Sequence, residues 1–272
     1  RVASRGLGDV YKRQIMNFIE QIRSLKTLTK KEIKRFFRIW QQTLLPSVIT
    51  TVLYFIIFGS FIGERIGEMG GFEYMQFMAP GLIMLAVITN AYSNVVSSFY
   101  GVKFQRSIEE LLVSPMPTYL ILIGFVTGGV VRGIIVGILV LFTSLFFTDI
   151  EIQNIPLTLL VIFLTAVLFS LGGLLNAIFA DSFDDINIVP TFILTPLIYL
   201  GGVFYSITLL SDTWQLISKL NPVLYMVNAF RYGMLGVSDI SVGFALAMIS
   251  FFIILFYILS LFILKRGIGI RS

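Results

Sequence analysis

Hydrophobic positions along this chain fall into long, nearly uninterrupted blocks separated by short polar segments. A block of about 20 apolar residues is long enough to cross the ~30 Å hydrocarbon core of a bilayer as an α-helix, which rises 1.5 Å per residue. The pattern therefore predicts an all-α membrane protein with six transmembrane helices. The expected spans are residues 44–63, 74–100, 118–147, 155–180, 188–205 and 242–264.

The segment before the first block, residues 16–43, has a different pattern. Apolar residues such as Phe18 and Phe36 fall near helical spacing, and a basic face including Lys30 and Arg35 lies between them. Such an amphipathic helix lies in the headgroup region of a membrane, with its cations near anionic lipid. A plain surface anchor and a helix that also contacts a cytosolic partner fit this pattern equally well.

A charged insert, residues 102–117, separates the second and third blocks. Spacing of i, i+3 and i+4 puts its apolar residues on one face of a short helix and its charges on the other. Pro115 and Pro117 end that helix. Such a helix at the water boundary lies on lipid or docks on a soluble partner, and we favour a partner. The apolar members are Ile108, Leu111, Leu112 and Val113, and the charged members are Arg106, Glu109 and Glu110.

Polar residues inside the expected spans mark a second candidate site. The second span contains Asn90, Asn94 and Ser97, which are costly against lipid and are expected to face protein or a water-filled path. Arg132 lies near the middle of the third span, where an arginine costs at least about 2.5–3.5 kcal/mol unless it is paired or hydrated. No acidic residue lies deep in any expected span, so the pattern names no partner for Arg132. These four residues are a possible translocation path, and interhelical hydrogen bonding without a transport role is the alternative for each.

Glycines and prolines add detail to the later spans. A ridge of five glycines in the third span predicts close packing against neighbouring helices. Two prolines interrupt the fifth span, which is tolerated where protein or water satisfies the freed carbonyls. Residues 206–236 predict a helical excursion at the outer membrane face, broken at Pro222, and a re-entrant course is the alternative. The ridge is Gly124, Gly128, Gly129, Gly133 and Gly137, and the prolines are Pro190 and Pro196.

Composition excludes several classes of protein. The chain is 57% hydrophobic and 13% charged, whereas soluble domains carry roughly 25% charged residues. It contains neither Cys nor His, which excludes disulfides, thiolate nucleophiles, imidazole catalysis and Cys/His zinc sites. Asp181, Asp184 and Asp185 share one turn, but they predict a solvated loop or a partner contact, and we expect no metal site. The sequence shows neither a Walker A pattern nor a dinucleotide fingerprint, so we expect no enzyme activity in this chain.

Basic residues predict the orientation, because cytosolic flanks are enriched in Lys and Arg. With a cytosolic N-terminus, the inner side holds seven basic residues in segment 16–43, two in the charged insert and three after the last span, with residues 1–15 not counted. The other side then holds three, Arg65, Lys219 and Arg231. Both termini are therefore predicted to be cytosolic, and the net charge of +5 reflects topology rather than nucleic-acid binding.

The first fifteen residues do not share the pattern of the rest. They are polar and basic, with no period, and they resemble translated adapter sequence ahead of a natural start at Met16. A genuine disordered tail is the alternative. In either case we expect no function there.

Five stretches of the chain together resemble the ABC-2 type transporter permeases, and they are most similar to the YadH-like bacterial inner-membrane group. The resemblance covers the chain from Met16 onward. The stretches are FRIWQQTLLPSVITTVLYFIIFGSFIG, MQFMAPGLIMLAVITNAYSNVVSSFYG, KFQRSIEELLVSPMP, FDDINIVPTFILTPLIYLGGVFYS and LNPVLYMVNAFRYGMLG.

This resemblance implies a homodimer of permeases seated on two cytosolic ATPase subunits. ATP and Mg²⁺ are then bound by the ATPases, and no cofactor is expected in this chain. It also implies that the charged insert holds a coupling helix, residues 105–113, which enters a groove on the ATPase. The residues assigned to coupling are Gln105, Arg106, Ile108, Glu109, Glu110, Leu111 and Leu112. The N-terminal amphipathic helix resembles the connecting helix of the family, which touches the ATPase as well.

The resemblance further implies a multi-pass protein of the bacterial inner membrane that exports its substrate by alternating access. The apolar, aromatic-rich composition favours an amphipathic or hydrophobic cargo such as a drug, a lipid or a glycan. Two other classes stay open. An ATP-independent secondary transporter is disfavoured by the lack of intramembrane acids. A non-transporting membrane scaffold is mildly disfavoured by the polar stripe of residues 90–98.

Overall fold

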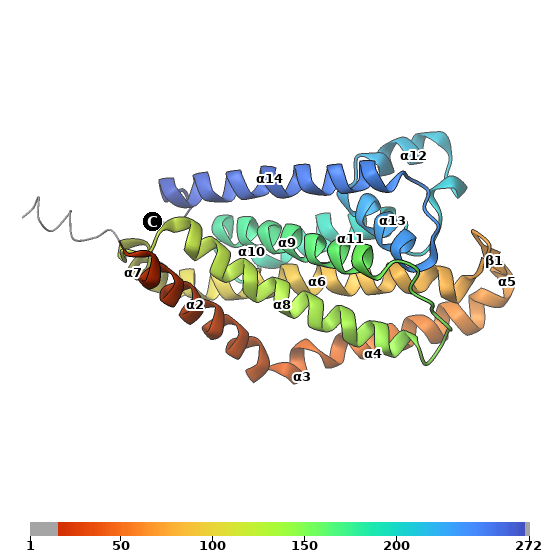
Figure 1. Ribbon diagram of the computed structural model, residues 1–272, viewed down its shortest axis with the longest axis horizontal. Coiled ribbons are helices and arrows are strands. Elements are labelled where there is room, and N and C mark those ends of the chain that lie inside the picture. Colours follow the sequence, from red (N-terminus) through yellow and green to blue (C-terminus); the bar gives the residue numbers. More distant parts are fainter. Residues whose placement is uncertain (1–15, 270–272) are drawn as a thin grey trace, which may run out of the picture.

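The computed structural model describes residues 16–269, so the tail of residues 1–15 lies outside the described residues. Long helices run side by side in one bundle, with a short helix, α7, at one end and helix α12 at the other (Figure 1). Among the described residues the protein is helical apart from one two-stranded hairpin. The prediction of an all-α membrane protein is therefore confirmed at the level of fold class.

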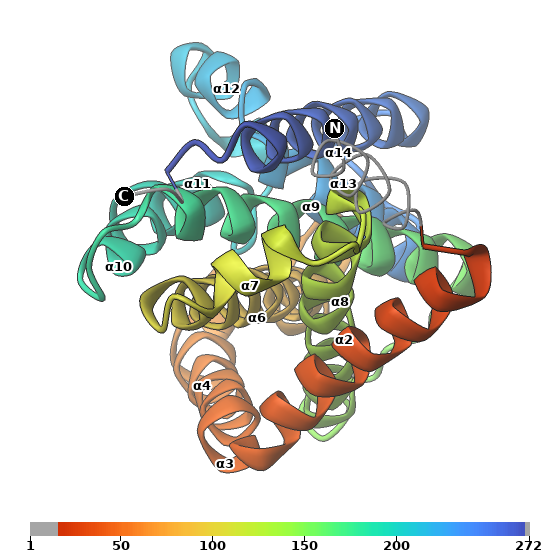
Figure 2. The same ribbon diagram turned by 90° about the vertical axis from the view of Figure 1, so that its left-hand side faces the viewer.

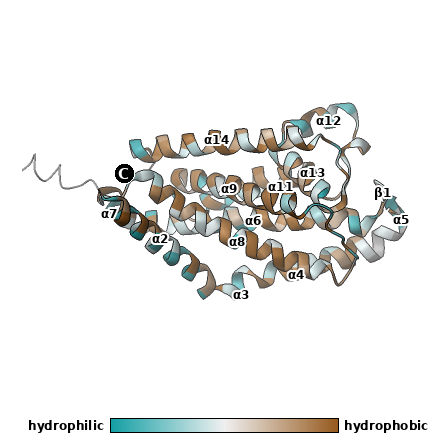
Figure 3. Cartoon of the chain, in the orientation of Figure 1, coloured by the Kyte–Doolittle hydropathy of each residue, from teal (hydrophilic) through white to brown (hydrophobic). Residues whose placement is uncertain are grey.

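Five helices in the described residues have the length and apolar composition to cross a membrane. Their ends lie within four residues of the predicted ones, because an apolar run must match the bilayer thickness. Figure 3 shows these helices as predominantly hydrophobic, whereas hydrophilic residues gather on α2 and at the ends of the bundle. The five are Trp40–Gly59, α6 (Tyr74–Phe104), α8 (Thr118–Ser144), α9 (Ile155–Phe179) and α14 (Val242–Arg266).

The first span is composite and is followed by a hairpin that the sequence pattern did not predict. It consists of α3 (Trp40–Thr43), α4 (Leu45–Tyr54) and a π-helix, η1 (Phe55–Gly63), after which comes α5 (Glu64–Ile66). Strands β1 (Glu68–Met69) and β2 (Phe72–Glu73) then pair antiparallel. Gly70 and Gly71 connect them with φ of 63° and 82°, and two positive φ values in a two-residue loop match the twist of a hairpin.

The expected fifth span is shorter than predicted. It consists of α10 (Asp185–Val189), a π-helical turn η2 (Pro190–Leu194) and α11 (Thr195–Leu200). Pro190 removes a ladder hydrogen bond at the point where the helix widens. Sixteen residues at 1.5 Å each reach about 24 Å, less than a full hydrocarbon core. This segment carries the chain from the α7 end back towards α12 (Figure 1), and the count of six spans stays a prediction.

Residues 206–236 form the two helices that the pattern predicts, with a break at Pro222. A 3₁₀ turn, η3 (Ile207–Leu209), and α12 (Asp212–Lys219) lie at the end of the bundle, and α13 (Pro222–Leu235) follows. The Asn221 side chain accepts a hydrogen bond from the Val223 amide at 2.9 Å and starts α13. Nearly all of α13 is buried against α6, α9, α11 and α14. The predicted half-helix is therefore part of the core, which fits the re-entrant course that the pattern left open.

Helix α6 is the centre of the bundle and is buried along most of its length. Glycines allow this burial where backbones meet. A Cβ atom on Gly173 of α9 would lie 2.5 Å from the carbonyl oxygen of Tyr92 in α6, and one on Gly133 of α8 would lie 3.0 Å from the Cβ of Ala91. The prediction that the glycine ridge of α8 marks helix packing is confirmed.

Helix α2 (Phe18–Arg38) lies obliquely across α8 (Figures 1 and 2). Asn17 and Glu20 form a capping box at its start, which pairs two otherwise free backbone amides. Its buried residues are Leu28, Glu32 and Phe36, spaced four apart on one face. The amphipathic pattern predicted the helix, and the structure shows that its inner face packs on protein.

Candidate functional site

Helix α7 (Ser107–Val113) lies at the end of the bundle where α6 stops and α8 begins. The chain turns at Arg106, the one non-glycine residue with positive φ among residues 16–269, at 59°. Gln105 and Arg106 therefore form the turn before the helix rather than its first residues, which corrects the predicted start at residue 105. A left-handed conformation costs a non-glycine residue roughly 1–2 kcal/mol, so the surrounding structure holds this turn.

The two faces of α7 divide as the sequence predicted except at Val113, which was expected on the apolar face but is 80% exposed at the last turn of the helix. Ile108 is 1% exposed, and Leu111 and Leu112 are half-buried. Glu109 and Glu110 are exposed in the first turn, where carboxylates favour the positive end of the helix dipole. The helix is thus anchored to the bundle by its apolar face and presents its acidic face outward.

Helix α2 meets α7 and the start of α8 at this end. The Tyr119 hydroxyl donates to Gln21 Oε1 at 2.9 Å. Between the two helices lies a groove of about 430 Å³, whose lining includes Arg23 and Lys31 from α2 and Leu111 from α7. The end of the bundle therefore combines an acidic helix, a basic helix and an apolar groove in one surface.

The predicted path residue Asn90 joins three helices. Its Oδ1 accepts hydrogen bonds from Arg132 Nε at 3.2 Å and Nη2 at 2.9 Å. Its Nδ2 donates to Ser47 Oγ at 2.9 Å and to the Ala86 carbonyl oxygen at 3.0 Å. Arg132, for which the sequence named no partner, is thus paired with an amide rather than with a carboxylate.

Asn94 and Ser97 lie one turn further along α6 and bind a residue of α2. Arg35 Nη2 donates to the backbone oxygen of Asn94 at 2.8 Å and to its Oδ1 at 2.9 Å, and Nη1 donates to Ser97 Oγ at 3.3 Å. Burial lowers the pKa of Arg35, and the neighbouring carboxylate of Glu32 opposes that shift. The structure therefore pairs the predicted path residues in two groups, Asn90 with Arg132 and both Asn94 and Ser97 with Arg35.

Glu32 lies at this site, but the sequence pattern did not predict it as a site residue. Its side chain is completely buried, accepts a short hydrogen bond from Ser98 and lies 3.5 Å from Arg35 Nε. A signal was present, because Glu32 stands between Leu28 and Phe36 on the apolar stripe of α2. A charge on such a stripe predicts a polar partner in the surface beneath it.

The aspartate turn is organised by its own hydrogen bonds. Asp185 Oδ2 accepts from the amides of Asp181 at 3.0 Å and Ser182 at 2.9 Å. The Asp181 amide, then the Ser182 side chain and amide, hold the pKa of Asp185 below its usual value. Lys103 Nζ donates to the carbonyl oxygens of Ile178 and Ala180 and lies 3.6 Å from Asp181, so it caps the end of α9.

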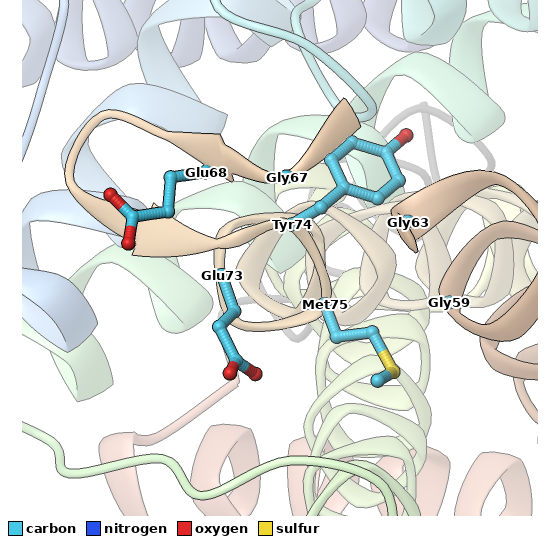
Figure 4. A pocket seen from close by; sticks show the side chains of 7 residues that line it. All are labelled: Gly59, Gly63, Gly67, Glu68, Glu73, Tyr74 and Met75. Atoms are coloured by element: carbon cyan, nitrogen blue, oxygen red, sulfur yellow. The ribbon is translucent and has the colours of Figure 1, made fainter. Parts of the chain in front are cut away.

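At the opposite end, the hairpin and the start of α6 border a cavity of about 380 Å³. Figure 4 shows Glu68 and Glu73 with their carboxylates directed away from Tyr74, whose ring points to the other side. The Tyr74 hydroxyl donates to the carbonyl oxygen of Phe204 at 3.1 Å. This hydrogen bond ties the start of α6 to the loop after α11.

These features define a polytopic α-helical membrane protein with a short amphipathic helix exposed at one end of its bundle. Residues 23–235 match the family described as ABC-2 type transporter. The chain therefore belongs to the ABC-2 type transporter family.

Curated relatives agree with this family. The chain is 58% identical over 249 residues to the inner membrane transport permease YadH of Escherichia coli (strain K12), covering 92% of this chain and 97% of the relative. It is 23% identical over 238 residues to nodulation protein J of Neorhizobium galegae, covering 86% and 91%. Nodulation protein J of Rhizobium meliloti (strain 1021) is 22% identical over 240 residues, with the same shares covered. The chain is a multi-pass transport permease of the inner membrane, as its sequence predicted.

Proposed function

We propose that this chain is the membrane subunit of an ATP-driven transporter and that it couples to cytosolic ATPase subunits through α7. The observation that carries the proposal is the build of α7: a left-handed turn at Arg106 and an apolar anchor at Ile108 hold its acidic face outward. A helix anchored to the bundle in this way can transmit a displacement of its partner as a rigid body. The groove between α2 and α7 extends the same surface.

The proposed complex contains two copies of this chain and two ATPase subunits, which bind ATP and Mg²⁺. Support for pairing comes from the first span, which leaves most of its apolar side chains exposed. Apolar side chains exposed along it would pack equally well on lipid or on a second copy. Closed twofold pairing is the commonest symmetry for such contacts. The exposed apolar residues of this span include Trp40, Leu45, Ile49, Leu53, Ile56 and Ile57.

Substrate is proposed to move between the paired copies. Ser93 and Ser97 are the exposed residues in the middle of α6, and hydroxyls facing outward from a central helix suit a polar path better than lipid. Asn90, Asn94 and Arg132 lie behind them and position this face through the hydrogen bonds of the two arginines. Six spans, both termini in the cytosol and outward movement of an amphipathic or hydrophobic cargo complete the proposal.

The test replaces the acidic face of α7. The double substitution Glu109→Gln and Glu110→Gln removes two exposed charges and leaves Ile108 in place. Co-purification with a cognate ABC ATPase and ATP hydrolysis stimulated by this chain are expected to fall at least fivefold. A matched double substitution at the other end, Asp149→Asn and Glu151→Gln, is expected to change neither, because these exposed residues lie far from α7.

Expression and thermal stability are measured for both double variants, so that loss of fold is separated from loss of coupling. If the α7 variant binds and stimulates the ATPase like the unmodified chain, α7 is not the coupling element. If the chain purifies without any ATPase, the secondary-transporter and scaffold hypotheses are favoured instead.

A further inference from the structure

A buried arginine at the α12 end of the bundle has no role in the function proposed above. Arg231 of α13 is 1% exposed. Its Cζ lies 3.9 Å from the centre of the Phe77 ring, and its Nη2 donates to the carbonyl oxygen of Gly202 at 2.6 Å. The guanidinium is therefore fixed in position between α6 and the loop after α11.

Most of the hydrogen-bonding capacity of Arg231 is unused. A guanidinium carries five N–H groups, and Nε and Nη1, which hold three of them, have no partner among residues 16–269. Among the same residues the ion pairs within 4.0 Å are Glu32–Arg35 and Lys103–Asp181. Arg231 therefore forms no ion pair there. A buried cation with unpaired donors is unfavourable unless another group supplies acceptors.

Arg231 lines a cavity of about 500 Å³ between the hairpin and the η3 turn. The hydroxyl-bearing residues Ser206, Thr208 and Ser238 line it as well. Asp239 is also present, but its carboxylate is occupied: Oδ1 accepts from Ser206 Oγ at 2.7 Å and Oδ2 from the Ile207 amide at 3.1 Å. Asp239 attracts Arg231 electrostatically but lies beyond ion-pair distance, so three guanidinium N–H groups have no acceptor among residues 16–269.

We propose that this cavity binds an oxyanion and that Arg231 is its cationic ligand. Guanidinium N–H groups match phosphate and carboxylate oxygens in geometry, and charge-assisted hydrogen bonds are stronger than neutral ones. The neighbouring hydroxyls already donate within the protein, Ser206 to Asp239 Oδ1 and Ser238 to the carbonyl oxygen of Ile240, so the guanidinium supplies the unused donors. A desolvated site of this kind binds an anion more strongly than an arginine in water does.

The acidic residues of the cavity limit the charge of the ligand. Asp239 and Glu68 both line it, and Figure 4 shows the Glu68 side chain on the hairpin directed away from Tyr74 and Met75. A group with a single negative charge, such as a phosphodiester, therefore fits better than a dianionic phosphomonoester. A phosphodiester could come from a lipid headgroup or from a water-soluble molecule, and the two sources share the same recognition chemistry. This site does not depend on the proposed ATPase coupling.

The test uses the full chain, purified in maltoside detergent and stripped of lipid. Short-chain phosphatidylglycerol and its free headgroup, glycerophosphoglycerol, are titrated separately, and the melting temperature and Kd are measured. We expect a rise in melting temperature with at least one probe. Arg231→Lys is expected to weaken that binding at least tenfold, because lysine keeps the charge but loses the planar fork. Lys219→Gln, which removes an exposed cation of α12, is the matched control and is expected to bind normally.

A second variant guards against misfolding of the buried substitution. Thr208 is exposed at the rim of the cavity, so Thr208→Asp adds a negative charge without disturbing the core, and Thr208→Asn is its neutral control. Only the Asp variant is expected to weaken binding, by about fivefold or more. Binding of both probes indicates a water-soluble ligand, and binding of phosphatidylglycerol alone indicates a lipid headgroup. The proposal is overturned if neither probe binds the unmodified chain, or if Thr208→Asp and Arg231→Lys bind as it does.

Discussion

Individual polar residues in this protein are paired between helices. Asn90 bonds Arg132 of α8 and Ser47 of α4, and Asn94 bonds Arg35 of α2. Such bonds are worth on average about 0.6 kcal/mol each in membrane proteins, because alternative partners exist before the helices associate. Their main effect is therefore to fix which faces meet, and the apolar contacts around them supply most of the stability.

Gly173 tests how closely α6 and α9 approach. Gly173→Ala places a Cβ 2.5 Å from the Tyr92 carbonyl oxygen, so the two backbones must separate. We expect a loss of about 1–3 kcal/mol of stability, measured as a drop of several degrees in melting temperature. The matched control is Gly101→Ala on α6, where the added Cβ meets nothing within 4 Å. Equal melting temperatures for the two variants would contradict the packing described for α6 and α9.

Among the elements, α2 has the most unexpected setting. Its pattern of basic and apolar residues is typical of a helix on a membrane surface. In the structure Leu28 and Glu32 lie against Gly124 and Gly128 of α8, and Arg35 reaches α6. The amphipathic pattern defines the inner face of α2, but it does not distinguish lipid from protein as the surface that covers this face.

Two adjacent phenylalanines separate these possibilities. Phe36 is completely buried and Phe37 is 48% exposed. If α2 is an integral part of the bundle, Phe36→Ala is expected to cost about 3–5 kcal/mol, whereas Phe37→Ala is expected to have a much smaller effect. The measurements are thermal unfolding in detergent and the rate of tryptic cleavage within the basic α2. Similar values for the two variants would indicate that α2 rests on lipid instead.

For the whole molecule, the informative surface is the outward face of α6. Most of α6 is buried, but Ser93 and Ser97 are exposed, next to a first span whose apolar side chains are also exposed. A lipid-facing surface would favour apolar residues at all of these positions. The contrast between the two serines and the apolar residues beside them is what favours a polar path between paired copies.

Cysteine labelling tests this surface cleanly, because the chain contains no cysteine of its own. Ser93→Cys is expected to react with a charged methanethiosulfonate, since the reagent needs an aqueous thiolate. Ile254→Cys, at a position of α14 that is 59% exposed, is the control and is expected to stay unlabelled in bilayers. Protection of both cysteines in the membrane-embedded complex would argue against a water-filled path along α6.

The sequence by itself determined the class of this protein. Span lengths follow from bilayer thickness, so five helices end within a few residues of where hydropathy predicts. The faces of α7 follow from helical spacing around Ile108, and the broken fifth segment follows from Pro190 and Pro196. These features depend on the hydrophobicity and backbone preferences of residues that are close together in the chain.

Only the tertiary structure decided which surfaces meet. In the structure Arg132 pairs with Asn90, and the buried Glu32 bonds to Ser98. Helix α13 lies in the core, and Arg231 lies beside a cavity with unused hydrogen-bond donors. Each of these depends on residues far apart in the chain. The sequence of a hydrophobic helix does not show whether lipid or another helix covers each face, because both remove the same apolar surface from water.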